Sequence, residues 1–363
     1  MILCFSPQPV GTNQTSGDVQ TPSGGVFSRK QFAHSYNDII SVENLLAAWQ
    51  EFLKGKRQKK DVQEFQSRLM DNILELHADL RDKTYRHGGY THFRISDPKP
   101  RDIHKASVCD RLLHHALYRR LYPFFDGTFI ADSYSCRLRK GIHRAMNRFR
   151  AFGYKASKNH TETLWILKGD IRKFFPSIDH EILCLILKSR ITDPDILWLL
   201  GEVIGSFYST AVGKGLPLGN LTSQLLVNVY MNEFDQFVKH RLKVKYYIRY
   251  ADDFVLLSRD KASLEHSLRY IAVFLRDQLK LKLHPDKVSI QTLASGIDFL
   301  GFVHFPYHRV LRTTTKRRML KRLESASEAG RQSYLGLLRH GNARGLECIL
   351  LKKHCTESFS IVE

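Results

Sequence analysis

The sequence predicts an α+β protein, because it contains segments of helical periodicity and separate short apolar segments of β character. Apolar residues recur at three- and four-residue steps through 65–80, which is the spacing of an amphipathic helix. Residues 164–171, LWILKGDI, are typical of a short buried strand. Residues 243–259 consist of two β-rich halves that meet at Ala251-Asp252-Asp253, and this pattern predicts a hairpin with the acids at its tip.

The same patterns predict the remaining regular elements. Periodicity indicates helices from Ser41 to Leu53, over about 180–189, 194–209, 222–240 and 261–280, and over the strongly basic segment 314–345. KVSIQTL, IDFLGFVHF and HRVLRT predict three short strands. Residues 91–160 are basic and interrupted by proline and glycine, and their pattern assigns no helix or strand.

The charge of the chain favours a polyanionic partner. Lys and Arg number 56 against 36 Asp and Glu, which gives a formal charge of +20, and the pI is about 9.7. Nucleic acid is therefore the first candidate. The alternatives are a soluble protein that is basic for another reason and a basic membrane-surface protein, although no long basic amphipathic helix supports the second.

Several other classes of protein are not indicated. The six cysteines are scattered without a CxxC pair, so they predict neither a zinc site nor a disulfide framework and suit a reducing cytoplasm. No apolar run reaches the roughly 18 residues of a membrane span. The beginning of the chain lacks the pattern of a signal peptide, and residues 1–35, rich in Ser, Thr, Gly and Pro, are expected to form a flexible tail.

The acids of the predicted strands suit a two-metal site. Asp170 ends one apolar strand, and Asp252 and Asp253 lie within an otherwise apolar β segment. Adjacent acids in such a setting are costly unless another charge offsets them. Nucleotidyl transfer uses two Mg²⁺ ions held by a few carboxylates, and Mn²⁺ can substitute. A solvated turn and a helix N-cap are the structural alternatives, but the combination of the two acidic segments favours the metal site.

Five ordered blocks over about residues 91–310 resemble a reverse transcriptase. GDIRKFFPSIDH, GLPLGNLTSQLLVNVYMNEFD, RYADDFVLL, KLHPDKV and GIDFLGF are similar to its catalytic, grip and closing segments. The resemblance implies a right-hand polymerase fold, with fingers, a palm made of an antiparallel sheet packed on helices, and a short helical thumb. It implies fingers at 91–162, a palm with the remaining fingers elements at 163–311 and a thumb at 312–345. We expect the rest of the chain to form the tail at 1–35, a helical extension at 36–90 and a second tail at 346–363.

The block GLPLGNLTSQLLVNVYMNEFD, which we call the grip segment, resembles one subgroup of reverse transcriptases in particular. Leu218-Gly219 and Ser223-Gln224 stand where retroviral and group II intron enzymes carry Gln-Gly and Ser-Pro. This pattern resembles the reverse transcriptases of diversity-generating retroelements, a group within the bacterial group II intron and retron superfamily. The resemblance implies error-prone copying of a template RNA, notably at adenines. It also implies a small, basic, oligomeric accessory protein as partner, besides template RNA, the RNA/cDNA duplex and dNTPs.

The resemblance also implies roles for individual residues. Asp170, Asp252 and Asp253 are expected to hold the two metal ions, and the backbone carbonyl of Ile171 to complete one coordination sphere. The incoming nucleotide is expected to contact six residues, namely Lys99, Arg101, Phe175, Leu218, Gly219 and Lys287. Template and primer are expected to contact five, namely Ser223, Gln224, Lys316, Arg317 and Lys321.

Most of these roles have a structural alternative. Phe175 either excludes the ribose 2′-OH as a steric gate or packs in the core, and Lys287 either protonates pyrophosphate, contacts phosphate or is solvated. Lys99 and Arg101 either bind the triphosphate or form a solvated turn, and Ser223 either faces the strand or caps a helix. For Arg111, Arg137 and Lys140, nucleic-acid contact and a structural role are equally open.

Three functions remain for the chain as a whole. The first is a mutagenic reverse transcriptase of a diversity-generating retroelement. The second is an antiphage-defence reverse transcriptase that makes cDNA from a noncoding RNA. The third, from a different class, is an inactive RNA-binding scaffold, which the presence of all three acids disfavours.

Overall fold

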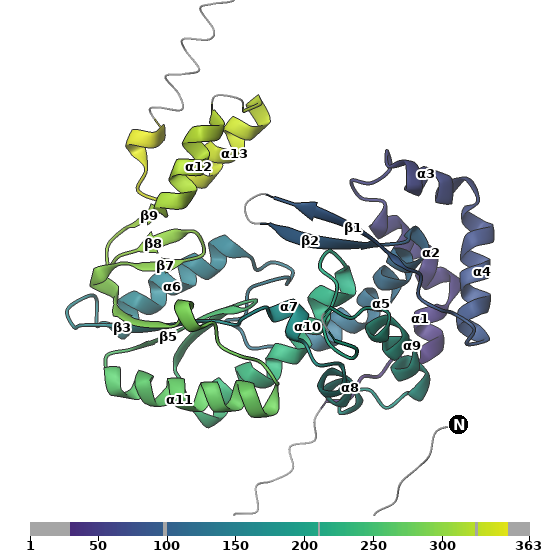
Figure 1. The fold of residues 1–363 in the computed structure, drawn as a ribbon, viewed down its shortest axis with the longest axis horizontal. Helices are drawn as coiled ribbons and strands as arrows, with labels where there is room; N and C mark the ends of the chain where they lie inside the picture. The colour runs from purple at the N-terminus through teal and green to yellow at the C-terminus, as the bar shows by residue number, and fades with distance from the viewer. Residues whose placement is uncertain (1–29, 97–99, 210, 324–325, 348–363) are drawn as a thin grey trace, which may run out of the picture. The chain divides into compact units, whose positions relative to one another are not determined.

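The centre of the fold is a four-stranded antiparallel sheet with the strand order β4-β5-β3-β6. Its strands are β3 (Trp165–Asp170), β4 (Tyr246–Tyr250), β5 (Asp253–Ser258) and β6 (Ser289–Thr292). Two of its strands, β3 and β5, are labelled in Figure 1. The computed structural model describes residues 30–96, 100–209, 211–323 and 326–347. Within these ranges the central sheet organises the layers on either side of it.

Both faces of the sheet are buried, which explains why its strands are almost continuously apolar. Phe254 and Leu256 of β5 belong to one core cluster, whereas Val255 and Leu257 belong to another. Successive residues of a strand point to opposite faces, so the two clusters lie on the two sides of the sheet. Three helices supply most of the covering residues, namely α6 (Ile142–Ala156), α10 (Leu221–Gln236) and α11 (Lys261–Gln278).

A helical region precedes and adjoins the sheet. Its helices are α1 (Tyr36–Ile40), α2 (Val42–Phe52), α3 (Lys60–Ser67), α4 (Leu69–Arg81) and α5 (Val108–Asp126). α5 is the central member, because it contacts both α2 on one side and α10 on the other. The antiparallel hairpin of β1 (Tyr90–Ile95) and β2 (Arg101–Ala106) projects from this region (Figure 1).

Three short helices connect β3 to the grip segment. They are α7 (Phe174–Ser177), α8 (His180–Lys188) and α9 (Pro194–Gly205). α8 and α9 begin at Asp179 and Asp193, whose carboxylates accept hydrogen bonds from backbone N–H groups of the first turn. These caps fix where each helix starts and so help to position the loop that leads into α10.

The C-terminal part consists of a small sheet and two helices. The antiparallel sheet is formed by β7 (Ile297–Phe299), β8 (Phe302–His304) and β9 (Arg309–Leu311). α12 (Thr313–Leu323) and α13 (Glu328–Leu338) follow it. Met319 and Leu323 of α12 pack with Phe302 of β8 in a third core cluster, which attaches these helices to the sheet.

The predicted α+β class, with an antiparallel palm sheet packed on helices, is confirmed. The sequence patterns missed α5, α6 and the β1–β2 hairpin, all within 90–156. The helix predicted over 222–240 changes at Phe237–Arg241 into a π-helical turn. Among the described residues, no helix combines the length and apolar character that crossing a membrane requires.

Candidate active site

The predicted carboxylates meet at one edge of the central sheet. Asp170 is the last residue of β3 and Asp253 is the first residue of β5, and the two stand directly opposite each other in the antiparallel register. The Ile171 N–H donates a hydrogen bond to the Asp252 carbonyl oxygen at 3.3 Å, which joins the two strand ends. Residues more than 80 positions apart in the sequence are thereby held side by side by backbone pairing.

The β4–β5 turn that presents Asp252 is conformationally constrained. Ala251 has a φ of +54°, in the left-handed region that residues with a Cβ atom adopt at a cost of roughly 1–2 kcal/mol. The guanidinium of Arg249 donates a hydrogen bond to the Ala251 carbonyl oxygen at 3.1 Å. This hydrogen bond from a buried side chain stabilises the left-handed conformation of the turn.

Arg249 is itself held by a buried network under the turn. Its side chain is 1% exposed and forms a two-pronged ion pair with Asp235, at 2.8 and 2.7 Å. Asp235 also accepts a hydrogen bond from the Tyr247 hydroxyl at 2.7 Å, and Asn228 accepts one from Arg249 at 3.2 Å. The attraction of Asp235 outweighs the desolvation cost of burial, so the pKa of Arg249 is raised and its charge is kept.

Gly169 allows the catalytic strands to pack closely. It stands opposite Phe254 in the β3–β5 register, and a Cβ atom built on it would lie 2.2 Å from the ring of Phe254. Any larger residue would force the ring or the strand to move, and with it the adjoining Asp170. The glycine is therefore required by packing beside the site.

The three carboxylates lie close together and are largely buried from water. Burial raises the pKa of Asp252, and the neighbouring Asp170 charge raises it further, while Lys287 and Arg101 partly offset the effect. Burial and then the charge of Asp252 raise the pKa of Asp253 to about 7. Carboxylates whose ionised forms are this unfavourable favour a bound cation as the compensating charge.

The donor set fits hard divalent cations such as Mg²⁺. The three side chains supply only oxygen ligands, and Mg²⁺ is commonly held by one or two carboxylates together with water and substrate phosphates. In the part of the chain that the structure describes, no three Asp, Glu, His or Cys side chains already converge on one metal position. The ammonium of Lys287 lies 3.0 and 3.1 Å from the two carboxylate oxygens of Asp170. The site thus fits a metal pair that water and substrate phosphates help to bind.

A cavity brings together three residues predicted to bind the nucleotide. It has a volume of about 470 Å³ and is lined by Arg101, Phe175 and Leu218, among others. Arg101 begins β2, Phe175 lies in α7, and Leu218 lies in the loop before α10. The attraction of Arg101 for Asp252 connects the cavity electrostatically with the acidic edge.

The loop before α10, which begins the grip segment, is hydrogen-bonded to the β1–β2 hairpin. The His104 N–H donates to the Leu218 carbonyl oxygen at 3.1 Å, and the Asn220 side-chain amide donates to the His104 carbonyl oxygen at 3.0 Å. Gly219 has a φ of +108°, and a Cβ atom there would approach Ile103 to 3.0 Å. Glycine is therefore needed for both its conformation and the close approach of the hairpin.

Three further candidates, Lys99, Ser223 and Gln224, differ in what the structure shows of them. Lys99 lies outside the described residues. Ser223 is only 2% exposed in the first turn of α10, whose N-cap is Asn220, and Gln224 is half-buried. Their contact with the template or primer stays a prediction.

The basic residues predicted for the thumb lie on the outer side of α12. The side chains of Lys316, Arg317 and Lys321 are exposed, opposite the buried Met319 and Leu323. This arrangement leaves the three cations available to a phosphate backbone.

Three basic residues left open by the sequence have structural partners. Arg137 donates to Asp126 at 2.7 Å and to three backbone carbonyl oxygens. Arg111 pairs with Asp61 at 2.6 Å, and Lys140 donates to the Ala131 carbonyl oxygen at 2.7 Å. These contacts favour the structural role for all three.

The network of Arg249, Asp235, Tyr247 and Asn228 was not predicted. A signal was present, because Arg249 lies inside the apolar strand segment YYIRY, where an isolated charge needs a buried partner. Nothing in the sequence identifies Asp235 as that partner.

The fold and this acidic edge define a polymerase of the right-hand class, with an antiparallel palm and its carboxylates on adjacent strands. The chain belongs to the reverse transcriptase family: residues 96–304 match the family described as "Reverse transcriptase (RNA-dependent DNA polymerase)". Enzymes of this family generally use divalent metal ions.

Curated relatives agree with this family. Protein YkfC of Escherichia coli K12 is 26% identical over 258 residues, covering 61% of this chain and 66% of the relative. The group II intron-encoded protein LtrA of Lactococcus lactis subsp. cremoris is 22% identical over 303 residues, covering 64% and 49%. The matched region thus spans between about half and two thirds of these relatives' own length.

Proposed function

We propose that the chain is an RNA-directed DNA polymerase that copies a template RNA into cDNA. The observation that carries this proposal is the direct pairing of Asp170 with Asp253, next to Asp252, on the palm sheet of a reverse transcriptase family member. In this proposal, the three acids hold two Mg²⁺ ions, with the Ile171 carbonyl as a further ligand. Such ions activate the primer 3′ oxygen and neutralise charge on the triphosphate.

The remaining residues of the site position the substrates. Arg101 offers a forked cation to phosphate oxygens, and Lys99 is proposed to act with it. Phe175 is proposed to fill the space next to the sugar, Leu218 and Gly219 to support the nascent base pair, and Lys287 to meet the leaving pyrophosphate. The proposed fingers at 91–162, palm at 163–311 and thumb at 312–345 hold template and primer around this centre.

Replacing both turn acids tests the metal assignment. Asp252→Ala/Asp253→Ala is expected to abolish dNTP incorporation in a primer-extension assay with an RNA template, while RNA binding is largely retained. Binding depends mainly on the cationic surface, whereas chemistry depends on the metal ions. Asp277→Ala, at the exposed end of α11, is the matched control. Retained extension in the double variant would contradict the assignment, and so would loss in the control.

Sugar selection tests Phe175. Phe175→Ala is expected to accept ribonucleotides much better than the wild type, because a steric gate acts by excluded volume. Phe175→Tyr keeps that volume and is expected to keep selection. The measurement is the ratio of kcat/KM for dATP and ATP, and an unchanged ratio in Phe175→Ala would assign the ring to the core.

Salt dependence tests the exposed cations of α12. Reversing the charges of Lys316, Arg317 and Lys321 is expected to weaken template–primer binding and to reduce the salt slope by up to about three units, near 0.9 per lost phosphate contact. Reversal of Lys54, Arg57 and Lys59, which are also exposed, is the control with the same change in net charge. An unchanged slope in the α12 variant would place this helix away from nucleic acid.

The finer proposal is that the polymerase belongs to a diversity-generating retroelement and copies template adenines inaccurately, with a small, basic, oligomeric accessory protein. It is supported by the sequence of the grip segment, where Leu218 replaces a glutamine. A glutamine amide can hydrogen-bond the incoming nucleotide, whereas Leu218 offers only volume. A net hydrogen bond of about 0.5–1.5 kcal/mol corresponds to roughly two- to tenfold discrimination.

Leu218→Gln is therefore expected to lower misincorporation opposite template adenine while most polymerase activity remains. Sequencing of cDNA made by both enzymes from one defined RNA measures the effect. Equal adenine error rates would remove Leu218 from the argument. A low, base-independent error rate in the wild type would instead favour the antiphage-defence role, for which a defence island among the genomic neighbours is the independent sign.

A further inference from the structure

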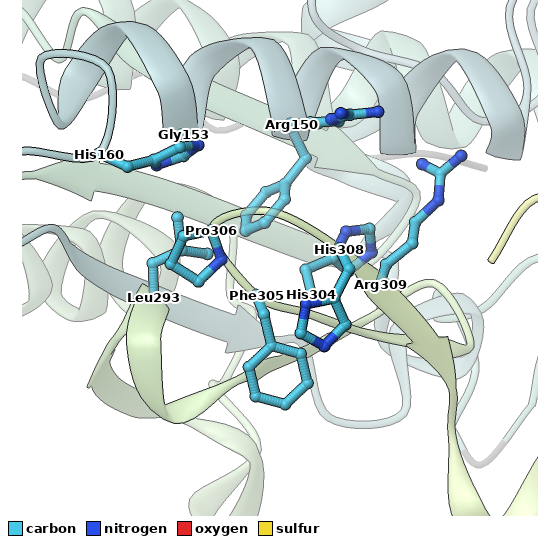
Figure 2. A pocket seen from close by; sticks show the side chains of 10 residues that line it. Arg150, Gly153, His160, Leu293, His304, Phe305, Pro306, His308 and Arg309 are labelled. Atoms are coloured by element: carbon cyan, nitrogen blue, oxygen red, sulfur yellow. The ribbon is translucent and has the colours of Figure 1, made fainter. Parts of the chain in front are cut away.

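A basic and aromatic groove lies between α6 and the loop that follows β8. It consists of a cavity of about 550 Å³ and an adjoining cavity of about 40 Å³, which share Arg150, His160 and Pro306. Figure 2 shows the smaller cavity, with His160 and Pro306 at one end and His308 and Arg309 at the other. We call these two cavities together the α6 groove.

The α6 groove presents a row of aromatic rings. Tyr154 and Tyr307 are 49% and 73% exposed, and the ring of His160 lies between them. The centroid of His160 is 5.4 Å from that of Tyr154 and 5.0 Å from that of Tyr307. Exposed aromatic rings in such a row offer flat faces on which unpaired bases stack.

The lining of the α6 groove carries positive charge without acids. Neither cavity is lined by Asp or Glu, within the part of the chain that the structure describes. Arg150 is exposed and forms no ion pair with any described residue, whereas Arg309 donates to Asn147 at 3.2 Å and to a backbone carbonyl. The Arg150 guanidinium is therefore available to a phosphate group.

The loop that carries His160 is held in one conformation by its own hydrogen bonds, without a ligand. Lys158, Asn159 and His160 all have positive φ values, between +48° and +66°. The Asn159 N–H donates to the Tyr154 carbonyl oxygen at 2.8 Å, and the Ser157 hydroxyl accepts from the His160 N–H at 2.9 Å. Strained residues persist only where surrounding contacts hold them, and here they set His160 between the two tyrosines.

The α6 groove is separate from the catalytic edge. Leu293, which lines the smaller cavity, donates a backbone hydrogen bond to Leu164 at 2.8 Å, just before the start of β3. Asp170 is at the other end of that strand, five residues beyond Trp165. At about 3.3 Å per residue, Asp170 lies roughly 16 Å along β3 from Trp165, the strand end next to Leu293.

We propose that the α6 groove binds single-stranded RNA that flanks the stretch being copied. The proposal rests on the proposed function, because in RNA-templated synthesis the new cDNA stays paired with its template, so the unpaired strand is RNA. Bases would stack on Tyr154 and Tyr307, and Arg150 would contact the intervening phosphate. The groove thereby gives the enzyme a second hold on its template outside the catalytic cleft.

Fluorescence anisotropy of the full chain tests the proposal with two template–primers. They share one duplex and differ in the single-stranded RNA extension of the template, about 4 or about 16 nucleotides, the range of known single-strand sites. The wild type is expected to bind the long extension more tightly. Tyr154→Ala/Tyr307→Ala is expected to lose this gain in affinity for the long extension. The expected loss is roughly 5- to 150-fold in Kd for each stacked base, which corresponds to about 1–3 kcal/mol.

Two further variants distinguish stacking from general damage. Tyr154→Phe/Tyr307→Phe keeps the rings and is expected to keep most of the gain. Tyr270→Ala removes an equally exposed tyrosine from α11, with 50% exposure, and is expected to leave the gain unchanged. A gain that survives in Tyr154→Ala/Tyr307→Ala, or an equal loss in Tyr270→Ala, would overturn the proposal.

A DNA extension of the same sequence tests the basis of binding. A comparable groove-dependent gain in affinity is expected with DNA, because ring stacking and a phosphate contact do not involve the 2′-OH, and a gain with RNA alone would contradict stacking as the basis. Primer extension by the wild type on the short-extension substrate separates this proposal from the proposed function. Primer extension without a groove-dependent gain in affinity would refute only the groove proposal. A groove-dependent gain in affinity without any primer extension would refute only the polymerase proposal.

Discussion

Two buried polar networks, one beneath the β4–β5 turn and one at the base of the β1–β2 hairpin, are built on different chemistry. Beneath the catalytic turn, Arg249 and Asp235 are fully buried charges that satisfy each other. At the base of the β1–β2 hairpin, His87 and His114 are linked at 3.2 Å, and Tyr90 joins His87 at 3.3 Å. The first network depends on a permanent charge pair, whereas the second depends on buried imidazoles.

The difference appears in how each network responds to protons. Burial, followed by the neighbouring charge of His87, lowers the pKa of His114 to about 3. His114 is thus held neutral, and acid would force a charge into an apolar site. Arg249 keeps its proton throughout the accessible range, because Asp235 stabilises the charged form. The charge of Arg249 beneath the β4–β5 turn therefore does not change with pH, whereas His114 at the base of the hairpin gains a charge in acid.

The largest expected effect comes from breaking the charge pair. Arg249→Met leaves the buried Asp235 with the Tyr247 hydroxyl but without a countercharge, which is expected to lower the free energy of unfolding by about 3–5 kcal/mol. Denaturant unfolding measures this loss. A change below about 1 kcal/mol would show that Asp235 simply takes up a proton and that the pair is not a requirement of the fold.

Replacing both partners separates stability from function. Arg249→Met/Asp235→Leu removes both charges and is expected to regain most of the lost unfolding free energy. Primer extension is expected to stay low, because the Ala251 carbonyl still lacks the donor that holds the turn. Recovery of both stability and activity would reduce the network to a structural role.

The next effect in size tests the pH dependence of the hairpin base. Between pH 6.5 and 3 the folded state binds fewer protons at His114 than the unfolded state, so lowering the pH favours unfolding. The expected loss between pH 7 and pH 5 is about 2 kcal/mol for this residue.

His114→Gln removes the titrating group and is expected to flatten the dependence over this interval. The matched control is His240→Gln, at an exposed histidine. Chemical denaturation at a series of pH values provides the measurement. Identical profiles for the wild type and His114→Gln would place the acid sensitivity elsewhere.

The smallest effect comes from trimming the hairpin network at its edge. The Tyr90 hydroxyl lies 2.8 Å from the Ser206 hydroxyl and 3.3 Å from His87. Tyr90→Phe removes one hydroxyl and is expected to cost about 0.5–1.5 kcal/mol. Tyr270→Phe, at an exposed site, is the control. A loss as large as that of Arg249→Met would erase the distinction between the two networks.

Much of the candidate site could be predicted because its key signals are local. An apolar strand that ends in an acid, and two acids between β-rich halves, are visible within a few residues. Only the structure showed that Asp170 stands opposite Asp253, because strand pairing joins segments that are far apart in the chain. It likewise brought Arg101, Phe175 and Leu218 to one cavity.

α5 shows why the sequence fell short between 91 and 160. Helices pack on several sides of it, and its buried residues include Asp110 and His114 as well as leucines. A helix buried on several sides, with polar residues in the core, has no single apolar stripe for periodicity to detect. The sequence by itself determined the amphipathic helices, the short apolar strands and the position of the acids. The tertiary structure alone decided which buried charge meets which partner, because that depends on packing between distant segments.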